Sequence, residues 1–278
     1  MQETIHILIP TFNRSNLIKA TIDSVIDQSY KFWVLTIVDN NSSDNTVQML
    51  KKNYQNFITQ KKIIIKTHDN FVVQADNWSR CINYIGKYKY FKLLGSDDLL
   101  DKDFLFIAMK ALEKTNDSIA GFTSGIRYID EKNNQIGRRT YGFFGFELPI
   151  SIFYRNYMGT PSSQLLKSKF FTNSRFYDIP YTTDVHFMIT YCYAKNKKLI
   201  FNKKLLADFR VWAESHTNKS YGSPFMIEGR HKCRNNMIKI IFKKSFYLFF
   251  LLSMSKVIRL VEYSYFFCFE KIKIYFKS

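Results

Sequence analysis

Two patterns of apolar and polar positions alternate along the first hundred residues. Short runs rich in Ile, Val and Leu, such as 4–10 and 32–40, predict buried strands. Between these runs, in 15–28, apolar residues recur every three or four positions, which predicts an amphipathic helix with Ser15 as its N-cap. The same patterns predict further strands at 61–70 and 90–98 and helices at 42–53 and 74–87. Strand–helix alternation requires crossover connections, so we expect an α/β fold with a mainly parallel sheet flanked by helices.

The pattern becomes less regular after about residue 105. Residues 118–137 predict a strand, a polar turn and a returning strand. The remaining predictions are a short helix at 148–157, a loop leading into a strand at 160–171, a helix at 181–198, and a strand that runs into a polar loop at 206–220. No internal repeat or low-complexity linker interrupts the chain.

Charge separates the last part of the chain from the rest. The 278 residues include 41 Lys+Arg and 23 Asp+Glu, a net charge of +18. Residues 230–278 carry half of this excess, with Glu262 and Glu270 as their only acids, and they are crowded with bulky apolar residues. Their longest uncharged run is 245–255, well short of the roughly 20 residues that cross a bilayer. This predicts amphipathic helices lying on an anionic membrane surface; the alternative is packing on the rest of the chain or a homodimer contact.

Cysteine usage and the N-terminus favour a cytosolic protein. The four cysteines are far apart and form no CxxC pair, which argues against a disulfide framework or a zinc site. The first residues lack the basic start and long apolar run of a signal peptide. We therefore expect reduced thiols and a cytoplasmic location.

Polar residues follow each of the first four predicted strands. They are Thr11 and Asn13, Asp39 to Ser43, Asp69 and Asn70, and Asp97 and Asp98. Each group alone is explained by the turn and cap preferences of Asn, Asp and Ser. Ligands of parallel sheets bind outside the carboxyl ends of the strands, so four such groups together predict one polar binding edge. The adjacent carboxylates of Asp97 and Asp98 repel each other, which suggests a divalent cation as their partner.

These motifs carry a family resemblance. The stretch "ILIPTFNRSNLIKATIDSVIDQSYKFWVLTIVDNNSSDNT", followed by "LLGSDDLL", resembles the nucleotide-sugar half of family 2 glycosyltransferases with the GT-A fold, and the similarity extends from Ile5 to His216. It implies a Rossmann-like GT-A fold. Residues 1–100 would bind the nucleotide-sugar, 101–222 would bind the acceptor and supply the base, and 223–278 would form a helical extension on the membrane surface.

The resemblance assigns roles to the polar edge. It implies that Asp39 accepts a base N–H and that Asp97 belongs to the nucleotide-binding set, which also includes Pro10, Thr11, Asn13, Asn41, Asp69, Asn70 and Ser96. For Asp44, both a ligand role and a simple interaction with the following helix N-terminus stay open.

The diphosphate site departs from the family pattern. Asp97 matches the last acid of the family's DxD motif and is expected to hold Mn²⁺ or Mg²⁺, with Asp98 as a further ligand. His216 is either a third metal ligand or a diphosphate contact, or a solvated histidine of the loop. Gly95 stands where many relatives carry the first acid, which puts the metal geometry in doubt. A helix cap and a surface charge are the alternative roles of the acidic pair. Arg210 matches an arginine that binds phosphate or pairs with a carboxylate.

The resemblance also places a catalytic base at the start of a helix in the second half, where Asp184 is the match. The alternative is that Asp184 only caps a helix beginning near Val185. Direct attack by an acceptor hydroxyl would invert the anomeric configuration. The QxxRW signature of processive synthases is absent, which favours addition of one sugar per event.

The expected function is transfer of a sugar, most simply from a UDP-sugar, to a lipid-linked saccharide in surface polysaccharide or O-antigen synthesis. The enzyme would sit at the cytoplasmic face of the cell membrane. A nucleic-acid-binding protein is one alternative, favoured by charge and aromatic content, but it leaves the acidic strand end unexplained. A non-catalytic scaffold of the same fold, suggested by Gly95, is the other.

Overall fold

The computed structural model describes residues 3–140, 159–177, 183–191, 195–212 and 235. Three predictions fall outside these residues. They are the helix at 148–157, the loop that carries His216, and the basic extension from residue 223 except for Asn235. No helix among the described residues is long and apolar enough to span a membrane.

The amino-terminal half forms the predicted parallel sheet. Strand β1 (Ile5–Thr11) lies between β2 (Trp33–Asp39) and β4 (Tyr90–Leu93), and β3 (Ile63–Thr67) extends the sheet beyond β2. The connecting helices are α1 (Ile18–Ile26), α2 (Thr46–Asn53), α3 (Gln55–Thr59), α4 (Gln74–Ile82) and the short η1 (Ile85–Lys87). The strand order β3-β2-β1-β4 brings the four polar strand ends to one edge, as predicted.

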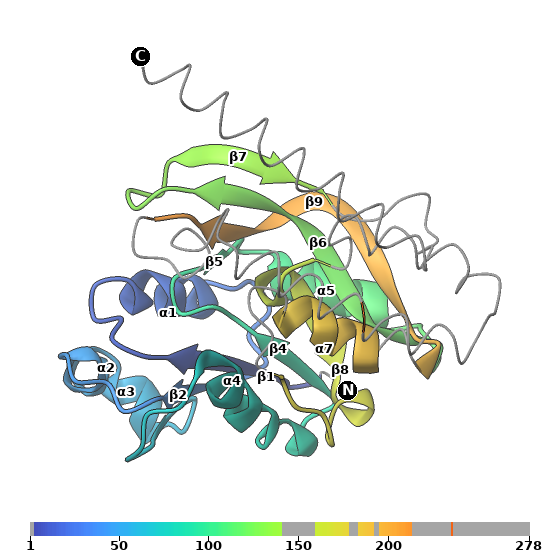
Figure 1. Ribbon diagram of the computed structural model, residues 1–278. Coiled ribbons are helices and arrows are strands. Elements are labelled where there is room, and N and C mark those ends of the chain that lie inside the picture. Colours follow the sequence, from blue (N-terminus) through green and yellow to red (C-terminus); the bar gives the residue numbers. More distant parts are fainter. Residues whose placement is uncertain (1–2, 141–158, 178–182, 192–194, 213–234, 236–278) are drawn as a thin grey trace.

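The second half continues the same sheet with mixed directions. It contains β5 (Leu99–Leu100), α5 (Phe104–Leu112), β6 (Ile119–Ile129), β7 (Gln135–Arg139), η2 (Pro161–Ser163), β8 (Gln164–Lys167), η3 (Ser168–Phe170), α7 (Thr183–Tyr191) and β9 (Lys198–Arg210). Strand β8 runs antiparallel to both β4 and β6, whereas β6 and β9 are parallel (Figure 1). The predicted return strand is β7, antiparallel to β6. The prediction of a mainly parallel sheet thus describes the first half, and the predicted halves 1–100 and 101–222 share one sheet.

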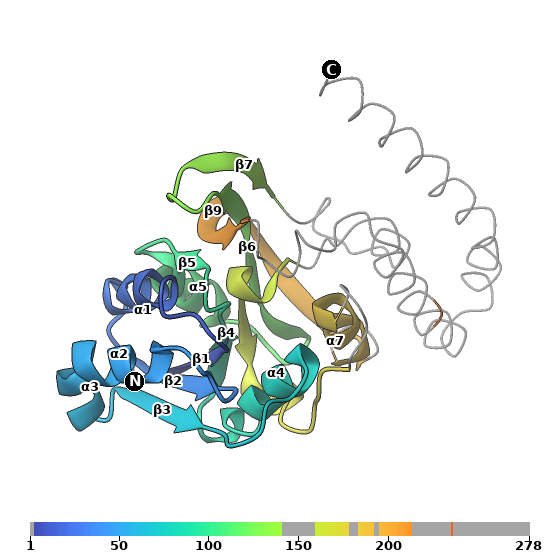
Figure 2. The ribbon, with the colours of Figure 1, turned by 60° about the vertical axis from the view of Figure 1, so that its left-hand side comes forward.

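Apolar cores cover both faces of this sheet. In β1, Ile5, Ile7 and Ile9 pack with α1 and α5 on one face, while Leu8 packs with α4 and α7 on the other. Figure 2 shows α1 and α4 on opposite sides of the strands. Burial on both faces explains why the strands read as continuous apolar runs rather than alternating ones.

The start of the first helix differs from the prediction. Helix α1 begins at Ile18, its N-cap is Leu17, and no side chain caps it, so the prediction of Ser15 as N-cap is wrong. The Ser15 N–H instead donates to Asp44 Oδ2 at 3.1 Å. Residues 12–16 therefore belong to a loop at the carboxyl end of β1 rather than to the helix.

Candidate active site

The loops after β1 and β2 are joined into one surface. Asn13 Oδ1 accepts the N–H of Ser43 at 2.9 Å, and the Asn13 N–H donates to Ser42 Oγ at 2.9 Å. Asn13 and Asn41 have φ of 50° and 63°, the left-handed region that asparagine adopts more easily than most residues. Pro10 and Thr11 end β1 beside Val38 and Asp39 of β2. The structure thus brings these predicted nucleotide-binding residues together.

Two carboxylates stabilise this surface. Asp39 is buried and accepts both the N–H and the hydroxyl of Ser42, the former at 3.0 Å. Asp44 accepts the N–H groups of Ser15 and Thr46 and the Thr46 hydroxyl. Burial favours neutral Asp44, but these hydrogen bonds outweigh it and lower the pKa of Asp44 below its usual range. Of the alternatives for Asp44, this geometry supports the one that anchors the loop to the start of α2.

The end of β3 adds an exposed group. Asp69 and Asn70 lie at the surface, and the Asn70 carbonyl accepts from Arg80 Nη2 at 3.1 Å. Arg80 Nη1 also donates to buried Asn40 at 2.8 Å, which holds this loop against the end of β2. The exposed rings of Phe12 and Phe71 lie 4.7 Å apart between the first and third strand ends.

The two adjacent acids after β4 point in different directions. Asp98 is 4% exposed. Its Oδ1 accepts the backbone N–H of Arg210 at 3.0 Å, and its Oδ2 accepts the Ser162 hydroxyl. The side chain of Asp97 is 21% exposed, and its Oδ2 accepts Trp212 Nε1–H at 3.2 Å. Ser96 is buried in the same turn. The divergence separates the two charges, whose repulsion the sequence predicts.

Gly95 is explained by the direction of Asp98. A Cβ at position 95 would lie 2.7 Å from Asp98 Oδ2 and 3.3 Å from Asp97 Oδ1, closer than normal contact for the first of these atoms. The inward Asp98 carboxylate therefore occupies the space that a first acid of the motif would need. The departure from the family pattern and the burial of Asp98 are one structural feature.

Asp97 fits a metal ion better than Asp98 does. Magnesium-type ions that bind substrate phosphates need only one or two protein carboxylates, and Asp97 presents such a group at the surface. Both oxygens of Asp98 are already occupied by hydrogen bonds. No group of three or more potential His, Cys, Asp or Glu ligands occurs among the described residues, and His216 lies outside them.

Arg210 connects the acidic turn to the β6–β7 hairpin. Its Nε donates to the Asp97 carbonyl at 2.8 Å, its Nη1 to the Asp130 carbonyl at 2.6 Å, and its Nη2 to Asn133 Oδ1 at 2.6 Å. The residue is 3% exposed. These contacts show Arg210 orienting the turn that carries Asp97; the prediction that it binds phosphate stays a prediction.

Buried charges lie beneath the turn. Lys92 of β4 is fully buried, and its Nζ donates to the carbonyls of Ser162 and Gln164, the latter at 3.2 Å. Burial lowers the pKa of Lys92 well below its usual range. Burial, together with the charge of Asp97, raises the pKa of Asp98 to about 7, although Ser162, Arg210 and Lys92 oppose the shift.

This shift predicts pH-dependent stability. The folded protein holds the Asp98 proton more tightly than the unfolded chain, where the pKa is 3.8. The stabilisation is complete below pH about 4 and is lost as the pH rises through about 7. In EDTA, the Tm of the wild type should fall between pH 5 and 8 by roughly 3 °C more than that of Asp98→Asn. Parallel Tm curves for the two proteins would contradict this assignment.

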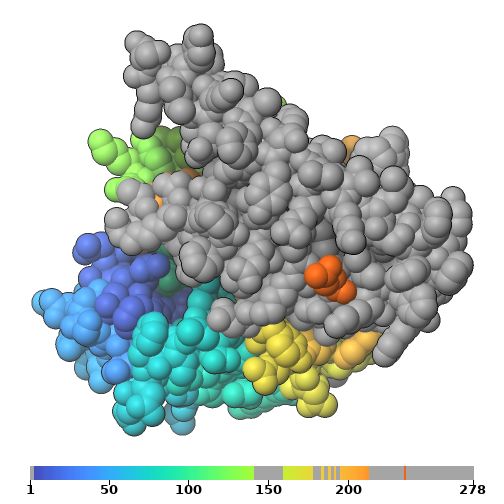
Figure 3. All heavy atoms as spheres, in the orientation of Figure 1, coloured from blue at the N-terminus to red at the C-terminus, as the bar shows by residue number. Residues whose placement is uncertain are grey.

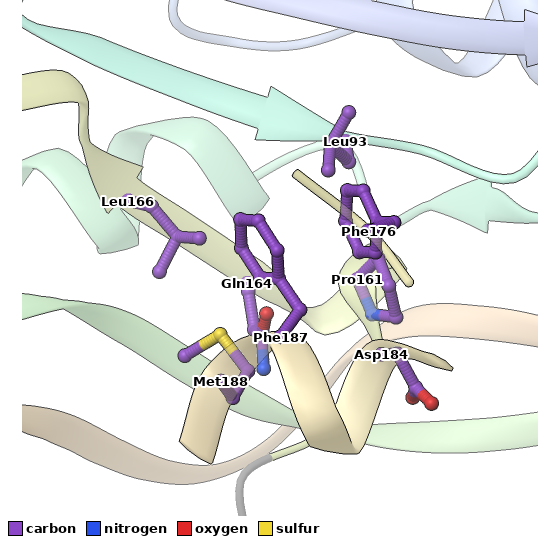
Figure 4. A pocket seen from close by; sticks show the side chains of 8 residues that line it. All are labelled: Leu93, Pro161, Gln164, Leu166, Phe176, Asp184, Phe187 and Met188. Carbon is purple, nitrogen blue, oxygen red and sulfur yellow. The ribbon is translucent and has the colours of Figure 1, made fainter. Parts of the chain in front are cut away.

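Asp184 lies in the first turn of α7, one residue after its start at Thr183, and not before the helix. It borders a pocket at the junction of α7, β4, β8 and η2 (Figure 4). The other residues lining this pocket are mainly apolar: Leu93, Pro161, Gln164, Leu166, Phe176, Phe187 and Met188. Ser162, which follows Pro161, contacts Asp98, so η2 connects the Asp184 pocket to the acidic turn.

Helix α4 and the segment that precedes α7 adjoin at the molecular surface. In the space-filling view, the cyan residues around α4 adjoin the yellow residues that precede α7 (Figure 3). The Phe176 N–H donates to Ser79 Oγ of α4 at 2.8 Å, which fixes this junction.

Sequence reasoning missed four residues of this arrangement: Arg14, Lys92, Ser162 and Trp212. Arg14 is part of the PTFNR motif, so its position was a usable signal. Lys92 is a charge in an otherwise apolar strand run, which is a second signal. Ser162 reaches the site from a distant segment, and nothing in its local sequence marks it. Trp212 lies two residues after Arg210, where relatives in the family usually carry His, and this position was a third signal.

Comparisons with known proteins identify the family of the chain and its fold. The family model described as "Glycosyl transferase family 2" matches residues 6–188. A curated Escherichia coli protein, UDP-Glc:alpha-D-GlcNAc-diphosphoundecaprenol beta-1,3-glucosyltransferase WfaP, is 31% identical over 96 residues, covering 34% of this chain and 36% of that protein. The chain spans less than half the length of most curated relatives that it matches.

Two solved structures share the fold. S. aureus TarS 1–349 in complex with UDP-GlcNAc has a TM-score of 0.66 at 14% identity, over 86% of this chain and 66% of that one. The mannosyltransferase PcManGT from Pyrobaculum calidifontis, in complex with GDP-Man and Mn²⁺, has a TM-score of 0.61 at 13% identity, over 84% and 65%. These likenesses confirm the α/β GT-A-like fold, with the mixed sheet described above.

Proposed function

The chain belongs to glycosyl transferase family 2, and on this basis we propose that it transfers a single sugar from a UDP-sugar to a lipid-linked glycan with inversion. The observation that carries this proposal is the order of groups along one sheet edge. The polar residues proposed to contact the nucleoside follow β3, β2 and β1, and the partly exposed Asp97 follows β4. Asp184 borders a pocket beside β4 and β8. The first groups follow the order of base and diphosphate in the donor, and Asp184 lies beyond them.

The donor would lie across the four strand ends. Asp39 would accept a base N–H as a further hydrogen bond, while the loops containing Pro10, Thr11, Asn13 and Asn41 contact the nucleoside. Asp69, Asn70 and Ser96 border the same edge. TarS, which has the same fold, binds UDP-GlcNAc, and this supports a nucleotide-sugar at this edge.

Asp97 would hold Mn²⁺ or Mg²⁺ when the metal is bound, and such an ion stabilises the negative charge that builds on a departing diphosphate. The Mn²⁺ in PcManGT supports this metal requirement. The protein's own part is to fix the Asp97 carboxylate, which the Trp212 indole and the Arg210 contact to the Asp97 carbonyl accomplish.

Asp184 would be the general base. Its carboxylate takes the proton of the acceptor hydroxyl as the oxygen attacks the anomeric carbon, and the bond to the diphosphate breaks. Attack from the face opposite the leaving group inverts the anomeric centre without a covalent enzyme intermediate.

The acceptor is proposed from the relatives and the basic extension. WfaP acts on a diphosphoundecaprenol-linked sugar, which supports a lipid-linked acceptor. Residues 230–278 would hold the protein on the anionic cytoplasmic face of the membrane through lysines and aromatic side chains. Surface polysaccharide or O-antigen assembly is the process such an acceptor would serve.

The full-length protein should bind and slowly hydrolyse one member of a panel of nucleotide-sugars. The panel should contain UDP-, GDP- and dTDP-sugars with Mn²⁺, with thermal shift and release of the nucleoside diphosphate as readouts. We expect stabilisation by a UDP-sugar and loss of that stabilisation in EDTA. Absence of any stabilisation across the panel would favour the non-catalytic scaffold instead.

A further inference from the structure

Arg14 is a cation at the strand-end edge whose contacts leave it incompletely paired. Its Nη1 donates to the carbonyls of Phe12 and Asn13, at 3.3 and 3.1 Å. Its Nε is buried and has no hydrogen-bond partner among the described residues. The nearest acid, Asp97, has Oδ2 4.0 Å from this nitrogen, too long for a hydrogen bond.

Trp212 holds the guanidinium in place. The Arg14 Cζ lies 5.3 Å from the centroid of the Trp212 ring, within the range of a cation–π contact. The same indole donates to Asp97 Oδ2 at 3.2 Å. The backbone N–H of Arg14 donates to Thr46 Oγ1 at 2.9 Å. The Trp212 indole therefore contacts both groups and holds the Arg14 guanidinium beside the Asp97 carboxylate.

The order of the strands locates Arg14 and Asp97 relative to the rest of the site. Arg14 follows β1, and Asp97 follows the adjacent strand β4. The groups proposed to contact the nucleoside follow β1, β2 and β3, and the Asp184 pocket lies beyond Asp97, beside β4 and β8. A diphosphate that joins a nucleoside to a sugar must therefore pass over Arg14 and Asp97.

We propose that Arg14 binds the donor diphosphate directly and supplies a protein-borne positive charge there in addition to any metal ion. A guanidinium presents a planar set of donors that matches phosphate oxygens, and its unpaired Nε–H provides one of them. A buried N–H without an acceptor is unfavourable, and a phosphate oxygen would supply the missing acceptor. This inference rests on the proposed function and deepens it.

A purely structural role for Arg14 makes a different prediction. An arginine that served only to neutralise Asp97 would be expected at hydrogen-bond distance from its carboxylate, as Arg127 is from Asp208. The Nη1 contacts to Phe12 and Asn13 fix the loop conformation, and that role would affect nucleoside binding and diphosphate binding equally. Comparing uridine with UDP separates the two roles.

The test is calorimetric titration of uridine and of UDP into the full-length protein, in EDTA and in Mn²⁺. In EDTA, Arg14→Met should weaken UDP binding at least about tenfold and leave uridine binding within about twofold. Arg14→Lys keeps the charge without the planar donors and should lose less. Arg175→Met is the matched control, because Arg175 also stacks on an aromatic ring, Tyr177 at 5.0 Å, outside the proposed donor contacts.

The outcomes separate this inference from the proposed function. If Arg14→Met binds UDP as tightly as the wild type in EDTA, or loses uridine and UDP affinity equally, Arg14 does not contact the diphosphate. If the wild type binds no UDP with Mn²⁺ present, the UDP-donor proposal and this inference fail together. A selective loss of UDP affinity in Arg14→Met establishes the contact, and the smaller loss in Arg14→Lys assigns part of it to donor geometry.

Discussion

Replacement of Asp184 by asparagine is expected to lower the turnover of sugar transfer by about 10³-fold while the Kd for UDP stays within about twofold. An amide cannot take up the proton of the acceptor hydroxyl, and a positioned general base typically contributes about 10²- to 10⁴-fold. Asp184 borders the pocket beside β4 and β8. Asp97 lies between this pocket and the residues proposed to contact the nucleoside, so donor binding should persist. The measurement is kcat with a lipid-linked acceptor, with UDP titration in parallel.

A control variant distinguishes catalysis by Asp184 from a role in stabilising helix α7. Asp76 is the acid in the first turn of α4 and is exposed, so Asp76→Asn removes the same favourable interaction with a helix N-terminus. That variant should keep kcat within about twofold. Similar small losses in both variants, with unchanged UDP affinity, would show that Asp184 is not the base.

Replacement of Asp97 by asparagine is the second large effect. We expect transfer to fall by about 10³-fold, or about 4 kcal/mol of transition-state stabilisation, because the metal ion would lose its protein carboxylate. The gain in UDP affinity that Mn²⁺ gives the wild type should disappear in the variant. In EDTA, where the metal is absent, both proteins should bind UDP similarly or the variant slightly more tightly, since a negative charge beside the diphosphate is removed.

The control is Asp27→Asn, which makes the same chemical change at the exposed C-cap of α1. Asp27 lies at the end of α1 that is remote from the β1 loop, so this variant should leave transfer unchanged. The Tm of Asp97→Asn should also stay close to that of the wild type, since Asp97 is partly exposed. An Asp97→Asn protein that still gains UDP affinity from Mn²⁺ would remove the metal role of this residue. We expect Asp97 to account for the metal-dependent part of the donor affinity and Arg14 for the metal-independent part.

The first half of the fold could be predicted because its signals are local. Strands such as β1 and β2 are apolar runs buried on both faces, and their connecting helices carry an apolar stripe. Once parallel crossovers are inferred, the polar residues at the strand ends must share an edge. Asp39, Asn13 and Asp97 were therefore found from sequence, and the structure brings them together.

The second half was harder because its strand directions depend on distant pairings. The sequence of β8 does not indicate that this strand runs antiparallel to β4, because the apolar pattern of a four-residue strand does not depend on its direction in the sheet. The start of α1 was misplaced for a related reason. Ser15 is a good N-cap by composition, but its N–H is taken by Asp44, which is distant in sequence and close in space.

The amino-acid sequence by itself determined the family, the alternation of strands and helices, and the strand ends on which polar groups gather, because each depends on residues near one another in the chain. Only the tertiary structure decided how those groups are divided. It turned Asp98 inward onto Ser162 and Arg210, left Asp97 facing outward, and placed Arg14 and Trp212 beside it. The directions of neighbouring side chains are set by partners from distant segments, and those partners meet only when the sheet is complete.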